Sequence, residues 1–415
     1  MKPQAKKQVL VFMLAPSLPA VSGGDIYAVN ALLPFVDEVD YHLFCYVAGE
    51  QDVAKVQSNQ ALYDSVFRSV HLEPRPKMPF EMARIPRTLK MVSHALQGLP
   101  FIDASYCSRS AISAVRRLVR RNGIDAIEVN SAHLAFFRHY LPDIPGVLIS
   151  HNIEADIFPF WMPVGLRGWK LHLMEWVAKR SRAAAHRVEI ENAFGFEAMT
   201  FISRHDMARV SASVPKYLMP LHFPIQTLPY ERKPKNVFNV LWMGGFGWYP
   251  NAEGVNWFAA EIFPLLKDKL ASNNIVLHFC GGNPPEALKA LHDGRHVHVH
   301  GFVDDLQPIL DDAHLLMVPL LSGGGIRVKI VEAMSAGIPV LSTSKGCEGI
   351  GGTDGVDIIV EDDSVRFAET LLACATDPQR MGRVAGAALD LMHREYSKQA
   401  SLDAKRNAYK HAGVM

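Results

Sequence analysis

The sequence has few cysteines, no long apolar run and almost no net charge, and each shortage excludes a class of protein. Five cysteines are spread over 415 residues without a C-x-x-C spacing, so reduced thiols in a reducing compartment are expected and a disulfide scaffold is not. No run of about 18 apolar residues is present, which argues against a membrane-spanning helix. The formal net charge of +1 gives no reason to expect nucleic acid as a partner.

The N-terminal segment combines basic residues with a short apolar run. Lys2, Lys6 and Lys7 precede Val9–Ala15, an arrangement that signal peptides share. The run is at the short limit for the apolar part of a signal peptide, and a glycine-rich turn follows it directly. We therefore interpret it as a first buried strand and expect a cytoplasmic protein, with a signal peptide as the alternative.

The most informative part of the chain is a glycine-rich loop between two apolar patterns. The elements expected around it are strand, loop, helix and strand, at Leu315–Leu321, Ser322–Gly325, Ile326–Ala336 and Ile338–Thr343. Such a unit is the building block of a parallel sheet. Gly323, Gly324 and Gly325 carry no Cβ atoms, so phosphate oxygens can approach bare N–H groups at the positive end of the helix dipole. The loop is therefore predicted to bind a diphosphate.

Charged residues follow this loop at helical spacing. Glu332 lies roughly 10 Å along the axis of a helix that starts near Gly325, which is about the reach of the ribose of a bound nucleoside diphosphate. Arg327 and Lys329 would neutralise the phosphates, but both can do so only if the first helical turn is irregular, because residues two apart on a regular helix point in different directions. The alternative is a surface pair of Lys329 with Glu332 beside a plain tight turn.

The segment Glu332–Val340, Glu-Ala-Met-Ser-Ala-Gly-Ile-Pro-Val, resembles the nucleotide-sugar signature of the GT-B glycosyltransferases, in particular glycosyltransferase family 4. That family has a glutamate at the position of Gly324, so this chain is similar to its triple-glycine branch. Backbone amides of Gly324 and Gly325 are the expected substitutes for the missing carboxylate. The resemblance implies that the donor is bound by Gly323, Gly324, Gly325, Ile326, Arg327, Lys329 and Glu332.

Two loops of the C-terminal half also match the family. Gly245 belongs to the loop that opens the C-domain, where many relatives carry an arginine and a lysine for the diphosphate and this chain has Phe246 and Asn251. The charge of the diphosphate would then rest on other residues of the site. Gly301 resembles the segment in which backbone meets the base of the donor. Asp305, just after it, is expected to cap the next helix.

Two segments of the N-terminal half match as well. Gly23 and Gly24 resemble the N-domain glycine loop, which faces the donor phosphates and the acceptor; a plain turn in which Asp25 caps a helix is an equal interpretation. His151 follows the apolar strand Val147–Ser150, and catalytic groups of α/β folds gather at strand ends. In the family a histidine at the corresponding strand end lies beside the transferred sugar. His151 is therefore the expected catalytic residue, with a structural hydrogen bond as the alternative.

The order of the expected elements is that of an α/β protein with two doubly wound domains. Apolar strands alternate with helices on both sides of Leu221–Lys235, a segment with three prolines that we interpret as a linker. We expect a GT-B fold with a Rossmann-like acceptor-side domain at 1–224, a nucleotide-sugar domain at 235–395 and a ligand cleft between them. The last segment, 396–415, resembles the terminal helix that returns to the N-domain in GT-B proteins.

The resemblance implies a retaining glycosyltransferase that moves a sugar from a nucleoside diphosphate donor to an acceptor hydroxyl, in polysaccharide or glycolipid synthesis. No metal is expected, since the Asp-x-Asp of metal-dependent GT-A enzymes is not apparent. Glu154 and Asp156 are weaker candidates for contacts with the acceptor. The alternatives are a nucleotide-sugar 2-epimerase, which would use the same loop, and a noncatalytic nucleotide-sugar-binding protein.

Three further patterns bear on partners and metals. In Trp161–Arg187, tryptophans on one helical stripe are flanked by basic residues, which fits peripheral contact with the inner face of an anionic membrane; a helix that packs its stripe on the core fits at least as well. The arginines between Arg116 and Arg121 are expected on a solvated helix face. His296, His298 and His300 alternate along a strand without acidic or cysteine neighbours, so no zinc site is expected.

Overall fold

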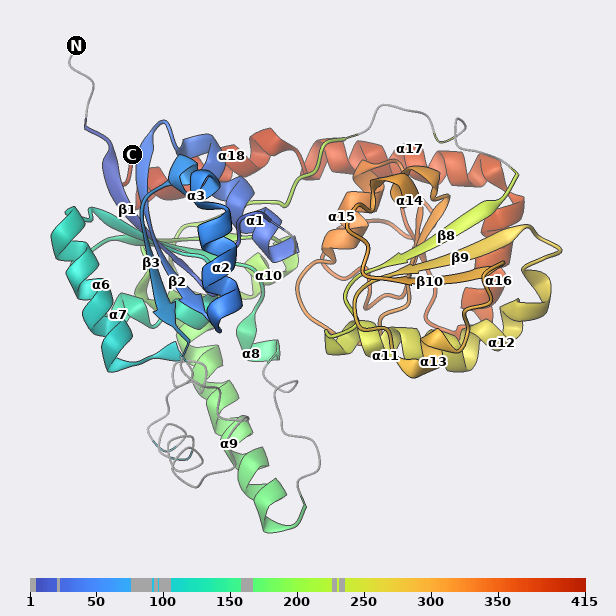
Figure 1. Ribbon diagram of the computed structural model, residues 1–415, viewed down its shortest axis with the longest axis horizontal. Coiled ribbons are helices and arrows are strands. Elements are labelled where there is room, and N and C mark those ends of the chain that lie inside the picture. The colour runs from blue at the N-terminus through green and yellow to red at the C-terminus, as the bar shows by residue number, and fades with distance from the viewer. Residues whose placement is uncertain are drawn as a thin grey trace. The chain divides into compact units, whose positions relative to one another are not determined.

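The computed structural model describes residues 5–20, 23–75, 92, 96, 106–157, 167–225, 230 and 236–415. The chain forms two compact units (Figure 1). Unit 1 comprises Met1–Met219 together with Ser401–Met415, and unit 2 comprises Pro220–Ala400. Of the expected linker at 221–235, residues 226–229 and 231–235 lie outside the described residues.

Unit 1 is built on a parallel seven-stranded sheet in the order β3-β2-β1-β4-β5-β6-β7. Its strands are β1 (Lys7–Met13), β2 (Val39–Val47), β3 (Phe67–Pro74), β4 (Ala126–Val129), β5 (Gly146–Ser150), β6 (Ala198–Phe201) and β7 (Lys216–Leu218). At the centre of the sheet, Val9 of β1 lies opposite Tyr41 of β2 and Ala126 of β4. The central strands are buried on both faces, which is why they are continuous apolar runs in the sequence.

Helices cover this sheet and enclose an aromatic core. In the core the ring of Phe12 stacks on that of Phe137 with centroids 4.6 Å apart, and Phe44 lies 5.3 Å from Phe137. The helices are α1 (Gly23–Leu32), α2 (Glu50–Ser58), α3 (Gln60–Val66), α6 (Arg109–Asn122), α7 (Phe137–Tyr140), α8 (Glu154–Ile157), α9 (Trp169–His186), α10 (Arg204–Arg209) and α18 (Lys398–His411). Short 3-10 or π turns are η1 (Leu33–Phe35), η2 (Ala132–Leu134), η4 (Arg187–Glu191) and η5 (Ala193–Gly195).

Unit 2 has the same architecture, with a parallel six-stranded sheet in the order β10-β9-β8-β11-β12-β13. Its strands are β8 (Phe238–Met243), β9 (Ile275–Cys280), β10 (Val297–Gly301), β11 (Leu315–Val318), β12 (Val340–Ser342) and β13 (Ile359–Val360). The helices α11 (Tyr249–Trp257), α12 (Phe263–Leu266) and α13 (Glu286–Lys289) lie on one side of it, and α14 (Gln307–Asp312), α15 (Val328–Ser335) and α17 (Pro378–Glu395) on the other (Figure 1). The remaining elements are α16 (Ser364–Thr376), η7 (Phe258–Ile262) and η8 (Lys267–Lys269).

The predicted fold class, α/β with two doubly wound sheets, is confirmed, and the sheets differ from the prediction mainly at their edges. Strands β3, β7 and β13 were not predicted, because they are edge or near-edge strands, polar or very short, and lack an apolar run. The N-cap of α14 is Leu306, and Asp305, one residue before it, accepts the N–H of Gln307 at 3.0 Å. All five cysteines are free thiols.

Helix α15 begins two residues later than predicted, at Val328. The cause is Arg327, whose backbone is extended with φ of −88° and ψ of 100°. The first turn of the expected helix is therefore irregular, which was the condition for Arg327 and Lys329 to serve the same site. The helix ends as predicted, with Gly337 in the left-handed region at φ of 69°.

Helix α9 projects from unit 1 beyond the edge of its sheet (Figure 1). Trp169 is 71% exposed, whereas Trp176 is 36% exposed and therefore more buried than exposed. Residues 161–166 of the proposed membrane contact lie outside the described residues. Within the part of the chain that the structure describes, no helix combines the length and the apolar character needed to cross a membrane.

Candidate active site

The loop between β11 and α15 needs its glycines. Gly323 and Gly325 have φ angles of 115° and 67°, in the left-handed region that other residues rarely adopt. A Cβ atom on Gly323 would also lie 3.1 Å from Nη2 of Arg327 and 3.1 Å from Cη2 of Trp248. Glycine is therefore required at these positions by conformation, and at Gly323 by space as well.

The backbone N–H groups of this loop are unused. Within the described residues, those of Gly323, Gly324, Gly325 and Ile326 donate to no acceptor. Helix α15 starts directly behind them, so the positive end of its dipole adds to the field of these donors. Unused N–H groups at a helix N-terminus form an anion-binding site.

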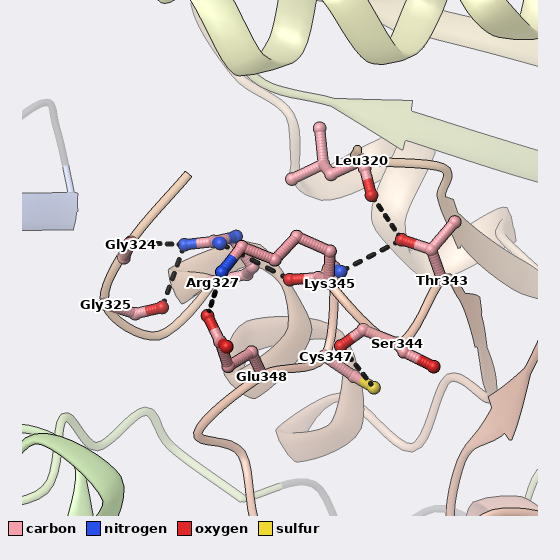
Figure 2. A network of polar contacts seen from close by, with 10 residues as sticks. Leu320, Gly324, Gly325, Arg327, Thr343, Ser344, Lys345, Cys347 and Glu348 are labelled. Atoms are coloured by element: carbon pink, nitrogen blue, oxygen red, sulfur yellow. Dashed lines mark hydrogen bonds and ion pairs between the residues drawn. The ribbon is translucent and has the colours of Figure 1, made fainter. Parts of the chain in front are cut away.

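The side chain of Arg327 forms hydrogen bonds with the backbone of this loop (Figure 2). Its Nη1 donates to the carbonyl oxygens of Gly324 and Gly325, the latter at 2.8 Å, and its Nη2 donates to that of Lys345 at 3.4 Å. The side chain is buried, and its Cζ lies 5.7 Å from the ring centroid of Trp248. Arg327 thus directs donors to carbonyls of the loop, which leaves the N–H side of the loop for a ligand.

The loop after β12 supports the glycine loop from the other side (Figure 2). Thr343 donates its hydroxyl to the carbonyl of Leu320 and accepts the N–H of Gly346 at 2.9 Å. The ammonium of Lys345 pairs with Glu348 at 2.6 Å. The charge of Lys345 is therefore neutralised within its own loop, and the ends of β11 and β12 are held together.

Among the described residues around the glycine loop, Lys329 is a cation without a carboxylate partner. Its Nζ donates to Oδ1 of Asn251 at 3.0 Å and lies 4.5 Å from the ring centroid of Trp242. A Cβ atom on Gly244 would be 2.8 Å from this Nζ, so the glycine makes room for the ammonium. Burial, and to a lesser extent the charge of Arg327, lowers the pKa of Lys329 to about 7. An enclosed ammonium without a carboxylate partner gains strongly from an added anion.

Glu332 lies one helical turn beyond Lys329 and is also without a partner. Within the described residues its carboxylate makes no hydrogen bond or ion pair, so the surface pair with Lys329 that was the alternative interpretation does not form. The side chain is half-buried, and this burial raises the pKa of the carboxyl. Glu332 is therefore available to accept hydrogen bonds from a ligand.

Asn251 connects this helix to the first loop of unit 2. Its Nδ2 donates to the carbonyl of Gly245 at 2.8 Å, while its Oδ1 accepts from Lys329. Gly301, at the end of β10, has a φ of 71°, and its carbonyl accepts the N–H of Gly281 at 2.7 Å. Gly245 and Gly301 thus lie in loops at the carboxyl ends of β8 and β10, on the edge of the sheet that also carries the glycine loop.

In unit 1, His151 lies at the carboxyl end of β5, as predicted. Its ring meets that of Tyr27 edge-on at 5.0 Å, and its buried Nε2 has no hydrogen-bond partner within the described residues. Burial lowers the pKa of His151 to about 4, against the opposing charge of Glu154. At neutral pH the group is therefore an uncharged imidazole with an unsatisfied nitrogen.

Residues distant in the sequence contact Glu154 and Ala155, which follow His151 closely in the chain. Nδ1 of His133 lies 3.3 Å from Oε1 of Glu154. The backbone N–H groups of Glu154 and Ala155 donate to the two carboxylate oxygens of buried Glu189, each at 3.0 Å. Glu189 thereby fixes the start of α8. No local signal identified His133 or Glu189, since they come from distant parts of the sequence.

Gly23 and Gly24 form the first turn of α1, so the predicted glycine loop is in fact the start of a helix. Ser22, which precedes them, lies outside the described residues. Asp25 follows in the first turn, where its charge favours the positive end of the helix dipole.

The histidines of β10 form a stacked group and not a metal cage. His298 and His300 stack on His278 of β9, each with centroids 5.3 Å apart, and His296 lies 3.1 Å from the carbonyl of Ile275. Among the residues that the structure describes, no group of three or more His, Cys, Asp or Glu is arranged to hold a metal ion.

Part of unit 2 is similar to a known protein family. Residues 237–377 match the family model of the group 1 glycosyl transferases. One curated relative, an uncharacterized 44.6 kDa protein in the cps region of Klebsiella pneumoniae, is 26% identical over 213 residues, which make up 49% of this chain and 54% of that relative. The chain thus spans about half the length of the curated relative it matches.

Solved structures share the fold of nearly the whole chain. TarM of S. aureus is similar with a TM-score of 0.65 at 10% identity, covering 99% of this chain and 100% of that one. Sucrose-phosphate synthase of Thermosynechococcus elongatus gives 0.64 at 13% identity, covering 98% and 100%. HepE of Anabaena, solved with UDP and glucose, gives 0.61 at 14% identity, covering 97% and 99%. The chain thus has the GT-B fold of these structures, and its residues 237–377 match the group 1 glycosyl transferases.

Proposed function

We propose that the protein transfers a sugar from a nucleoside diphosphate sugar to an acceptor hydroxyl. The observation that carries the proposal is the enclosed ammonium of Lys329 beside a glycine loop whose N–H groups have no acceptor. A diphosphate supplies both missing partners, since it brings negative charge to the ammonium and oxygen acceptors to the N–H groups. Glu332, farther along the helix, accepts hydrogen bonds from ribose hydroxyls, as the family resemblance implies.

In the proposed reaction the bond between the anomeric carbon and the diphosphate breaks while the acceptor oxygen bonds to the same carbon, and the proton of the acceptor hydroxyl passes to the departing phosphate oxygen. Negative charge builds on the departing phosphate oxygen, so the loop N–H groups and Lys329 bind the transition state more strongly than the intact donor. This is the interaction that accelerates transfer. We assign these groups the role that a metal ion has in other transferases, and expect neither a metal nor a cofactor.

His151 is assigned to the transferred sugar. As an uncharged imidazole with an unsatisfied Nε2, it can exchange a hydrogen bond with a sugar hydroxyl without placing a charge in an enclosed site. The resemblance to family 4 implies that the configuration at the anomeric carbon is retained. HepE was solved with UDP and glucose, so UDP-glucose is the first donor to test.

The acceptor that we propose is a growing polysaccharide or a glycolipid, and helix α9 is the proposed contact with the inner face of a membrane. Trp169 and Trp176 are exposed, and the guanidinium of Arg180 lies 5.4 Å from the Trp176 ring. Exposed tryptophans beside cations are typical of helices that lie in the headgroup region of anionic membranes.

The test is a screen of UDP-, GDP-, dTDP- and ADP-sugars that measures thermal stabilisation and donor consumption by the full chain. One nucleotide family should stabilise the wild type and be consumed, and Lys329→Gln should lose both effects. The matched control is Lys289→Gln, which removes an exposed lysine paired with Glu286 in the same unit.

The alternatives have distinct outcomes in this screen. Stabilisation without consumption, in the presence of a range of acceptors, would favour a noncatalytic binding protein. Conversion of the donor to its 2-epimer would favour an epimerase. Absence of stabilisation by every nucleotide sugar at millimolar concentration would refute the assigned site.

A further inference from the structure

Helix α6 carries an unusual charge for a helix that covers a sheet. Its sequence, RSAISAVRRLVRRN, has five arginines and no acidic residue, and it packs Ala111, Ala114 and Val115 into the core. Within the described residues, none of its arginine side chains forms a hydrogen bond or an ion pair. The exposed side of α6 therefore has a high positive charge that no acidic group among the described residues neutralises.

Three of these arginines line a groove of about 510 Å³ between α6 and β3, the edge strand of the unit 1 sheet. The groove is lined by His71, Ala114, Arg117, Leu118, Arg120 and Arg121. Arg117 and Arg121 are one helical turn apart, so their side chains emerge on the same face with Cβ atoms about 5–6 Å apart. The groove thus combines closely spaced guanidinium groups with a small apolar floor.

The polar side chains on the β3 side of the groove, His71 and Glu73, already have partners within the protein. The ring of His71 stacks on Phe44 at 5.4 Å, and its Nε2 lies 3.1 Å from Oε2 of Glu73. The other oxygen of Glu73 accepts the hydroxyl proton of Ser110 at 2.7 Å. Glu73 is buried and committed to these partners, so within the described residues the arginines have no counter-charge from the β3 side, and an anionic ligand would supply it.

We propose that this groove binds an anionic saccharide that carries carboxylate or phosphate groups on neighbouring sugar units. Guanidinium groups bind carboxylate and phosphate oxygens in a bidentate manner, and the spacing of Arg117 and Arg121 suits two anionic groups on one chain. Ala114 and Leu118 offer an apolar surface to the C–H face of a sugar ring. The choice of a saccharide rests on the proposed function, for which the groove would hold an acidic acceptor chain away from the site of transfer.

The shape and composition of the groove favour a saccharide over a membrane surface. A membrane-binding helix inserts large apolar side chains between its cations. The structure describes every residue of α6, and none of them is a large apolar residue with an exposed side chain. A concave groove also fits an extended oligomer better than a flat bilayer.

The test is binding of a fluorescent oligogalacturonate to the full chain, measured by anisotropy at low salt, with a malto-oligosaccharide of the same length as the neutral probe. The acidic probe should bind and the neutral one should not. Arg117→Gln/Arg121→Gln should weaken binding by at least about tenfold, because two charge-assisted contacts are lost. The matched control is Arg109→Gln/Arg116→Gln, which removes the same charge from the same helix outside the groove and should stay within about twofold of wild type.

Other outcomes would overturn the proposal. Equal weakening by both double variants would mean that only the general charge of α6 matters. Absence of binding to the acidic probe would also refute the proposal. So would binding to phosphatidylglycerol vesicles, instead of the saccharide, that depends on Arg117 and Arg121. Far-UV circular dichroism and the thermal midpoint of each variant establish that α6 is folded.

The experiments distinguish a failure of the groove proposal from a failure of the proposed transferase function. Stabilisation by the donor sugar reports on unit 2 and does not involve α6. If the donor is bound and consumed while oligogalacturonate is not bound, the groove assignment falls and the transferase assignment stands. If the groove binds the acidic probe while no nucleotide sugar is bound, the reverse holds.

Discussion

Nζ of Lys405 lies 2.9 Å from Oε2 of Glu128, and the two side chains are only 1% and 0% exposed. Glu128 is on β4 in the middle of the unit 1 sheet, whereas Lys405 is on α18, close to the C-terminus. Lys405 also donates to the carbonyl of Ala31 at 2.6 Å, and the hydroxyl of Tyr409 donates to Glu128. Each buried charge thus has its opposite charge and at least one further hydrogen bond, and such hydrogen bonds help an ion pair to be tolerated in a core.

Lys405→Met should therefore lower the free energy of unfolding by about 3–5 kcal/mol, because it leaves a buried carboxylate without its cation. Urea denaturation of the full chain, followed by circular dichroism, measures the change. The control is Arg406→Met, which removes an exposed pair with Glu38 from the same helix and should cost at most about 1 kcal/mol. Equal losses in the two variants would show that the buried pair has no special role.

Donor binding should take up a proton above neutral pH. Free Lys329 has a pKa of about 7, and a bound diphosphate favours the charged form, so its pKa rises on binding. At about pH 8 binding should then take up close to one proton and at about pH 6 almost none, so that affinity falls as the pH rises through this range. Calorimetry in two buffers of different ionisation enthalpy measures the uptake. Lys329→Met should abolish it, and persistence of the uptake in that variant would assign it to another group.

Gly325→Ala should destabilise the glycine loop by about 1–2 kcal/mol, because an alanine is strained at a φ of 67°. The donor affinity should fall with it, by about tenfold or more, since the loop N–H groups shift. Thermal unfolding and donor titration give the two values. In the control Gly386→Ala, on α17, the new Cβ atom meets nothing within 4 Å; stability should rise by about 0.5–1 kcal/mol with unchanged affinity.

His151→Ala should lower the transfer rate by about 10²-fold with donor affinity within about twofold of wild type, because it removes a contact to the reacting sugar and none to the nucleotide. Since burial lowers the pKa of His151 to about 4, the imidazole stays uncharged down to that pH, and it should cause no loss of rate near the usual histidine value. Steady-state kinetics from acidic to neutral pH check both points. His139→Ala, at an exposed histidine, should leave the profile unchanged.

Trp169→Ala/Trp176→Ala should reduce sedimentation of the protein with phosphatidylglycerol vesicles several-fold, because apolar burial in the headgroup region is lost. The control Leu265→Ala removes an exposed apolar side chain from unit 2 and should have no effect. Unchanged sedimentation in the double tryptophan variant would remove α9 as the membrane contact.

The sequence was informative where the physical signal is local. The central strands were predicted because burial on both faces makes them apolar runs, and the glycine loop because residues such as Gly325 serve a backbone conformation that few others adopt. Edge strand β3 was not predicted, because Arg68, His71 and Glu73 interrupt its apolar pattern.

The roles of single side chains were harder to predict, because they depend on residues distant in sequence. Arg327 was expected at the phosphates, and the sequence did not indicate that its guanidinium also donates to carbonyls that include that of Lys345. The contact of Lys329 with Asn251 and that of Glu128 with Lys405 each join elements far apart in the chain. Periodicity and spacing do not report such pairings.

The position of α18 also has a consequence for how the protein is made. A ribosome releases the strands of the unit 1 sheet first, then all of unit 2, and only then the helix that brings Lys405 to Glu128. During this interval β4 holds a carboxylate that lacks its cation. Unit 1 therefore completes its core only after unit 2 has been translated, and a premature stop codon just before α18 would leave unit 2 whole and unit 1 unfinished.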